Sequence, residues 1–275
     1  MDCGFFCLRS YNHLPGENKP CFKCLGGKWE EAAMYNCKPF PTNDPGMVDF
    51  LVKLKSYADS GNVKFLAQND RQEKLAVRHF GVNAIVNASG LWTEDFNQLP
   101  LNIDLSIAKD YNVVVHNTIL EAKGIIWTIL LAAKCPDITF LFPMNADSIA
   151  PWVPSPPANC VFKNMSWETG LKEAVAKARL TLVPSLWSAP IEGSLIKSLY
   201  YSKAVAVVHA EYSYSSELPS EIIYKLSPEI ESASMQMKSL FINNWMPDTE
   251  KLNEFKRGFI SENTMILNRI RKLVS

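Results

Sequence analysis

Between residues 110 and 209, short apolar runs typical of buried strands alternate with segments of helical periodicity. The strand-like runs are 111–115, 138–142, 160–162, 180–183 and 204–208, and the helical segments are 123–134, 169–179 and 194–201. Strands that are apolar on both faces need cover on both faces, as in a parallel sheet with helices on each side. The pattern therefore predicts a Rossmann-like parallel sheet from Asp110 to about His209.

The part of the chain before residue 105 predicts a smaller α/β part with an irregular head. Turn-forming residues and five of the seven cysteines fall in the first forty positions, so long regular elements are not expected before about Met47. The other expected elements are helices at 48–58 and 70–80, strands at 63–67 and 84–86, and one or two amphipathic helices over 249–273. We therefore expect two domains, residues 1–104 and 105–275.

The composition excludes several classes of protein. With 47% hydrophobic residues among 275, the chain can bury a core and is not intrinsically disordered. Lys plus Arg equals Asp plus Glu at 28 each, so the overall charge favours neither nucleic acid nor an acidic membrane surface. The apolar run 125–133 is too short to span a membrane, and the first residues do not resemble a signal peptide. These features predict a soluble, cytoplasmic protein without a membrane span.

The segment 182–199 is the strongest candidate for a binding site. A predicted strand ends at Pro184, a proline-limited loop follows, and Gly193 and Ser194 open the next helix. Ligands of open parallel sheets bind beyond the carboxyl ends of the strands, where the first N–H groups of a helix attract anions. The same residues also fit a plain strand-turn-helix with Ser194 as a capping residue, and spacing alone does not separate the two interpretations.

The segment resembles the donor-binding motif of the GT-B glycosyltransferases, especially the large retaining family 4. Pro184-Ser185 match the opening of the family motif, and 197–205 match its close. Lys123-Gly124 occupy the place of a Lys-Gly pair whose lysine is expected to contact the donor diphosphate. Further similarity covers 65–82, 84–96, 167–179 and, in the head, Asp2, Cys7, Cys21 and Cys24.

The resemblance implies a GT-B-like α/β fold with a C-terminal Rossmann-like half and a shortened N-terminal, acceptor-side part. It also implies an enzyme of polysaccharide biosynthesis that moves a hexose from a nucleoside-diphosphate-sugar to a glycan, lipid-linked or protein acceptor, with retention of configuration. No metal is expected at the reacting centre, and contact with a membrane surface would fit a lipid-linked acceptor.

Three departures from the family pattern leave alternatives open. The two motif glutamates fall on Ala189 and Lys197, and an expected arginine falls on Thr118. The chain also begins where half of a normal N-terminal domain would be complete, as expected for a fragment or for a shortened relative. A non-catalytic relative that binds nucleotide-sugars or a partner is therefore the main alternative, whereas an epimerase of the same fold would need more acids and histidines.

Site residues follow from the register of the motif and from charge. The leaving diphosphate must be neutralised while the sugar acquires positive charge. The expected donor-binding residues are Lys123, Gly193, Ser194, Ser185 and Thr118, and the expected catalytic residues are Glu192, Lys197 and His116. Three simpler interpretations remain: Glu192 paired with Lys197, Lys123 solvated at a helix start, and His116 in a structural role.

The cysteine-rich head is a candidate structural zinc site. Cys3 and Cys7 form one closely spaced pair, and Cys21 and Cys24 form another. Four thiolates in tetrahedral geometry suit a zinc ion that stabilises a loop without a core of its own, with Cys37 and His13 as spare ligands. Free buried thiols are the alternative interpretation.

Overall fold

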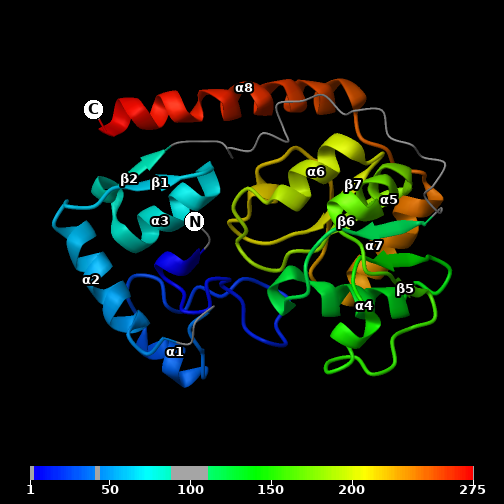
Figure 1. The fold of residues 1–275 in the computed structure, drawn as a ribbon, viewed down its shortest axis with the longest axis horizontal. Helices are drawn as coiled ribbons and strands as arrows, with labels where there is room; N and C mark the ends of the chain where they lie inside the picture. Colours follow the sequence, from blue (N-terminus) through cyan, green and yellow to red (C-terminus); the bar gives the residue numbers. More distant parts are fainter. Residues whose placement is uncertain (1–2, 41–43, 88–110, 275) are drawn as a thin grey trace.

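The computed structural model describes residues 3–40, 44–87 and 111–274, which form two α/β parts (Figure 1). The smaller part contains the N-terminal head, and the larger part contains a six-stranded sheet. The last helix, α8 (Thr249–Val274), runs from the larger part back toward the smaller one. Within the described ranges, no helix combines the length and the apolarity needed to cross a membrane.

The larger part is built on a parallel sheet whose strand order is β5-β4-β3-β6-β7-β8. Its strands are β3 (Val113–Val115), β4 (Phe140–Phe142), β5 (Cys160–Phe162), β6 (Leu180–Val183), β7 (Val205–Val208) and β8 (Tyr224–Leu226). From β3 the chain adds strands first on one side and then, from β6, on the other. The order therefore reverses between β3 and β6, and ligands bind at such switch points in open α/β sheets.

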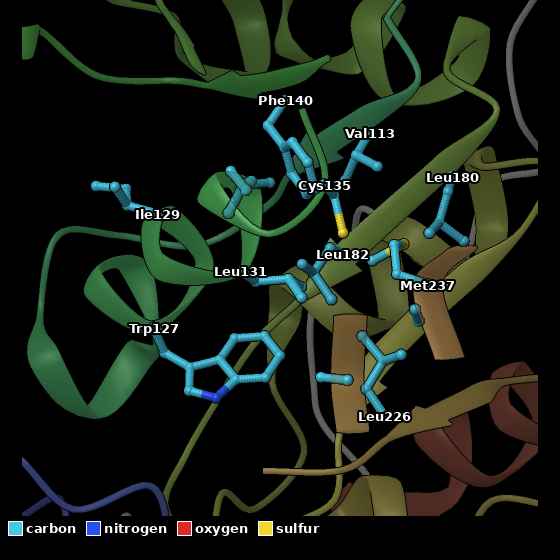
Figure 2. Close-up of a cluster of buried hydrophobic side chains, with 14 of the residues drawn as sticks. Val113, Trp127, Ile129, Leu131, Cys135, Phe140, Leu180, Leu182, Leu226 and Met237 are labelled. Carbon is cyan, nitrogen blue, oxygen red and sulfur yellow. The ribbon is translucent and has the colours of Figure 1, made fainter. Parts of the chain in front are cut away.

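Apolar side chains cover both faces of this sheet. Figure 2 shows one cluster, in which Trp127 and Leu131 from a helix and Met237 from another lie against strand residues that include Val113 and Leu182. The helices of the larger part are α4 (Ile125–Ala133), α5 (Lys172–Lys177), α6 (Gly193–Tyr201), α7 (Ile230–Ile242) and α8. Helices α4 and α7 contact each other, whereas α6 contacts α5 and α8.

The smaller part combines two short parallel strands with three α-helices in its described residues. The strands are β1 (Phe65–Ala67) and β2 (Ile85–Asn87), and the helices are α2 (Met47–Asp59), α3 (Asp70–Phe80) and, in the head, the short α1 (Glu30–Met34). Buried head residues such as Phe5 and Phe6 pack on this layer. The same cluster includes Trp187 and Ala189 from the larger part, so the two parts share a core.

The structure corrects the sequence prediction at several elements. The predicted helix 169–179 is wrong in extent, because α5 is only six residues long and an irregular turn with Gly170 at φ 107° precedes it. The predicted helix 123–134 begins later, at Ile125, because Gly124 adopts a left-handed conformation. The larger part continues beyond the predicted end near residue 209, because β8 adds a sixth strand to the sheet and helix α7 follows it. The predicted domain boundary at 104/105 lies outside the described residues.

Gly124 brings the loop after β3 against the loop after β6. A Cβ atom at this position would lie 1.8 Å from the carbonyl oxygen of Pro184, and the φ of 73° disfavours any other residue. We expect Gly124→Ala to lower the free energy of unfolding by about 3 kcal/mol or more, from overpacking added to backbone strain. Denaturant unfolding followed by circular dichroism measures the change.

Gly193→Ala is the matched control for this substitution. A Cβ atom at Gly193 would meet nothing within 4 Å, and its φ is not positive. The control should change the free energy of unfolding by no more than about 1 kcal/mol. Equal stability of the two variants would contradict the close contact between the loops.

Candidate functional site

A cavity of about 700 Å³ opens at the carboxyl ends of the strands, beside the switch point between β3 and β6. The loop after β3 contributes His116 and Thr118, and the start of α6 contributes Gly193 and Ser194. Tyr11 of the head closes one side. Segments distant in sequence therefore meet where parallel α/β sheets bind ligands.

Lys123 and Glu192 form a buried ion pair at this cavity. Their side chains are only 14% and 9% exposed. The same carboxylate oxygen, Oε1 of Glu192, accepts a hydrogen bond of 3.0 Å from the hydroxyl of Ser185. The structure thus gives Glu192 another partner, Lys123, than the Lys197 considered from the sequence, and Lys123 is not a solvated lysine.

The network continues from Ser185 to the loop after β3. Nδ2 of Asn117 donates to the hydroxyl of Ser185 at 3.0 Å. The backbone N–H of Thr118 donates to Oδ1 of Asn117 at 3.1 Å. Asn117 thus links the two loops at the switch point, although nothing in the sequence marked it beyond its place beside His116.

The N-terminus of α6 faces the cavity without a side-chain cap. Glu192 occupies the N-cap position, but within the described chain no side chain caps the helix, because the carboxylate turns to Lys123 and Ser185. A Cβ atom added at Gly193 would meet open space. The first backbone N–H groups of this nine-residue helix can therefore approach an anion in the cavity.

His116 is a buried, neutral imidazole at the rim of β3. Its ring stacks on Trp167 with centroids 5.2 Å apart, and Nδ1 lies 2.9 Å from the hydroxyl of Ser198. That hydroxyl donates its proton to the carbonyl of Ser194, so Nδ1 must be the donor to Ser198. Burial, with a smaller effect of Lys197, lowers the pKa of His116 to about 4. Nε2 therefore keeps its lone pair near pH 7 and acts as a hydrogen-bond acceptor.

The remaining expected residues differ in their access to the cavity. Nζ of Lys197 lies 5.0 Å from the centroid of the Trp167 ring, and Lys197 is not among the residues that line the cavity. Ser185 also lies outside the lining and contributes through its hydrogen bonds with Glu192 and Asn117. Thr118 lines the cavity, as expected for a donor-binding residue.

Two aromatic residues shape the site around Lys123. Nζ of Lys123 lies 5.0 Å from the ring centroid of Trp187 and 5.5 Å from that of Tyr11, within the range of cation–π attraction. The two rings pack edge to face, with centroids 4.7 Å apart. Trp187 stood in the motif loop, but no sequence signal connected Tyr11 with a lysine more than one hundred positions later.

The head cysteines are not grouped as a metal-binding set in the described part of the chain. The thiol of Cys3 is buried and donates a hydrogen bond to Oδ1 of Asn12 at 3.3 Å. Burial raises the pKa of Cys7, and Cys24, Cys21 and Cys37 add smaller electrostatic effects in the same direction. Among residues 3–40, 44–87 and 111–274, no group of three or more His, Cys, Asp or Glu residues is placed to bind a metal ion.

Comparison with known proteins relates the structure to glycosyltransferases. No protein-family model matches the sequence, and no curated protein is significantly similar to it. Among solved structures, the chain is similar to TarM with a TM-score of 0.56 and 16% identity, over 85% of this chain and 47% of TarM. A glycosyltransferase from Rickettsia africae gives a TM-score of 0.57 at 12% identity, over 89% of this chain and 78% of that chain. Sucrose-phosphate synthase from Thermosynechococcus elongatus gives a TM-score of 0.60 at 12% identity, over 91% of this chain and 66% of that chain.

These similarities establish the GT-B fold for this chain. They agree with the expected α/β architecture and with the Rossmann-like sheet of the larger part. The chain spans about half the length of TarM. At 12 to 16% identity the similarity concerns the fold, and the activity must be argued from the site.

The depressed pKa of His116 predicts a pH-dependent stability. Above pH 6.5, His116 is neutral in the folded and in the unfolded chain. Between pH 6.5 and about pH 4, only the unfolded chain binds a proton at this histidine. Stability is therefore full above pH 6.5 and is lost as the pH falls. From pH 7 to pH 4, we expect the free energy of unfolding to decrease by about 2 to 3 kcal/mol more in the wild type than in His116→Asn.

Denaturant titrations at several pH values test this difference. His209→Asn, which removes an exposed histidine outside the cavity, serves as the matched control and should keep the pH dependence of the wild type. If the free energy of unfolding changed with pH in the same way for the wild type and His116→Asn, the pKa of His116 would be the same in the folded and unfolded chain, and the prediction would be wrong.

Proposed function

We propose that this protein is a glycosyltransferase that takes its sugar from a nucleoside-diphosphate donor. The observation that carries the proposal is the meeting of Lys123 with the uncapped start of α6 at the switch-point cavity. A lysine and a set of helix N–H groups together provide the charge that a leaving diphosphate requires. The cavity volume of about 700 Å³ also lies within the range of small-molecule sites.

In this proposal the donor diphosphate binds between Lys123 and the N–H groups of Gly193 and Ser194. Ser185 and Thr118 stabilise the two loops that carry these groups. The sugar then lies toward His116, whose Nε2 accepts a hydrogen bond from a sugar hydroxyl. Lys197, beside Trp167 and His116, adds positive charge near the leaving group.

Glu192 has two functions in the proposed mechanism. Before the donor binds, its carboxylate neutralises Lys123 and avoids the cost of a buried unpaired charge. When the diphosphate replaces Glu192 as the ion-pair partner of Lys123, the carboxylate can accept hydrogen bonds from hydroxyls of the sugar or the ribose. Donor binding therefore includes an exchange of ion-pair partners, which lowers the net gain from the lysine.

Two structures with a similar fold support this choice of donor. A trehalose-phosphate synthase from Burkholderia vietnamiensis, with a TM-score of 0.53, is described as UDP-forming. A TarM variant from S. aureus was solved with UDP, fondaparinux and a GlcNAc-glycerol. For this chain we propose a hexose donor, retention of configuration and a glycan, lipid-linked or protein acceptor, within polysaccharide biosynthesis in the cytoplasm.

A non-catalytic role is the second candidate, because the motif glutamates are replaced. Ala189 is buried in the core shared by the two parts, where a carboxylate would lack water. Lys197 lies over the Trp167 ring. A protein without these acids can still bind a nucleotide-sugar, so only turnover of the donor separates the two candidates.

The Lys123–Glu192 pair gives a direct test of donor binding by titration calorimetry with UDP and GDP. Glu192→Gln removes the competing carboxylate and should tighten binding of the nucleoside diphosphate. Lys123→Met in that same background should then weaken binding at least about tenfold, since a charge-assisted contact of about 1.5 kcal/mol or more is lost. The Glu192→Gln background avoids leaving a buried carboxylate unpaired.

Lys163→Met is the matched control, because Lys163 follows β5 at the same edge of the sheet but lies outside the cavity. It should leave the dissociation constant unchanged. Absence of nucleotide binding in the wild type would refute both candidate functions. Slow release of sugar from a bound UDP-sugar by the wild type would exclude the non-catalytic one.

Metal analysis decides between the two interpretations of the cysteine head. The thiol of Cys3 is already engaged in a hydrogen bond to Asn12, which favours a protonated thiol at this position. We expect purified protein to contain less than half an equivalent of zinc and to show all its cysteines as thiols after unfolding. One equivalent of zinc, retained on dialysis, would instead support a site that uses Cys7, Cys21 and Cys24.

A further inference from the structure

A second cavity, of about 250 Å³, lies between the head and the loop that carries Lys123. The head contributes Arg9, Tyr11, His13, Lys38 and Phe40, and the loop after β3 contributes Glu121 with its two neighbours. Tyr11 lines this cavity and also the larger one. The two cavities therefore share an aromatic wall, and this second one is not part of the donor site described above.

His13 lines this cavity and carries a buried ring nitrogen that has no hydrogen-bond partner among the described residues. The side chain is 2% exposed, and Nε2 lies 2.7 Å from the backbone carbonyl of Glu17. A carbonyl accepts only, so Nε2 carries the proton, and burial lowers the pKa of His13 and keeps the ring neutral. Nδ1 thus has a lone pair, and in the described part of the chain it has no hydrogen-bond partner. Such a group costs about 1 to 3 kcal/mol until a donor, such as a ligand hydroxyl, reaches it.

The charges at this cavity favour an anion. Arg9 and Lys38 bring two positive charges, and the Glu121 carboxylate brings one negative charge. Oε1 of Glu121 also accepts the backbone N–H of Gly16 at 3.3 Å, which partly satisfies this carboxylate. A ligand that carries a phosphate or carboxylate would therefore be attracted to Arg9 and Lys38, both of which remain accessible.

Aromatic side chains make the rest of the wall suitable for a sugar or a polyol. The rings of Tyr11 and Phe40 pack edge to face, with centroids 5.6 Å apart, and Phe40 is 39% exposed. Small-molecule sites typically combine such apolar walls with a few polar groups that fix orientation. Hydroxyl groups, an apolar face and one anionic group together define the ligand.

We propose that this second cavity binds a sugar or polyol that carries a phosphate or carboxylate, with the anion at Arg9 and Lys38 and a hydroxyl donating to Nδ1 of His13. If the proposed glycosyl transfer is correct, this ligand is the acceptor, because the cavity adjoins the donor cavity at Tyr11. The binding itself does not depend on the proposed function.

Saturation-transfer NMR on the full chain tests the proposal with matched probes. The probes are glucose 6-phosphate, glycerol 3-phosphate and glucuronate, each compared with glucose, glycerol and inorganic phosphate. We expect at least one hydroxylated anion to bind at least tenfold more tightly than both its neutral counterpart and inorganic phosphate. Comparison of the phosphates with glucuronate identifies the preferred anionic group.

Variants locate the bound probe. Lys38→Gln should weaken binding of the probe at least fivefold, and His13→Phe should also weaken its binding. Lys64→Gln, at an exposed lysine outside the cavity, should leave the affinity for the probe unchanged. UDP affinity, measured on the same variants, should remain at its wild-type value. Equal binding of inorganic phosphate and the sugar phosphates, no binding of any hydroxylated anion, or binding unaffected by Lys38→Gln would overturn the proposal. Failure of UDP to bind the wild type would refute only the proposed function.

Discussion

The close approach of Gly124 to the Pro184 carbonyl determines the geometry of the larger part's binding site. Only a residue without a Cβ atom allows the backbone after β3 to contact the backbone after β6. Ala122 and Leu186 add a backbone hydrogen bond of 2.8 Å between the same loops. These contacts place Lys123 within reach of Glu192, although 68 residues separate the two in sequence. The buried ion pair is therefore a consequence of backbone packing.

The central strands were predictable because each is a continuous apolar run that is buried on both faces. Strands β3 and β6 are completely buried, and the sequence located both, as it located α3 from Asp70 to Phe80. Edge strand β8 escaped prediction because its three residues, Tyr-Lys-Leu, show neither a continuous apolar run nor a clear alternation. Burial on both faces thus leaves a stronger sequence signal than position at the edge of a sheet.

The sequence indicated the candidate site only where its residues closely follow a strand or begin the next helix. Lys123, Gly193 and Thr118, which the resemblance suggested as donor-binding residues, line one cavity, because the carboxyl ends of parallel strands meet at one edge. The partner of Glu192 and the role of Tyr11 could not be predicted, since both depend on how loops from distant segments pack. Similarly, sequence spacing grouped Cys3 with Cys7, but tertiary contacts directed Cys3 to Asn12.

The loop after β6 has two structural roles, because it lines the switch-point cavity and completes the core beneath the head. The backbone N–H of Ser188 donates to Asn12 of the head at 2.9 Å, and the Trp187 ring is buried in the same core. A rigid-body rotation of one part against the other would therefore have to break a packed hydrophobic contact and a buried hydrogen bond. Opening and closing of the switch-point cavity is consequently expected to proceed through side-chain rearrangement around Lys123. A chimera that exchanges the head alone would leave Trp187 without its complementary surface.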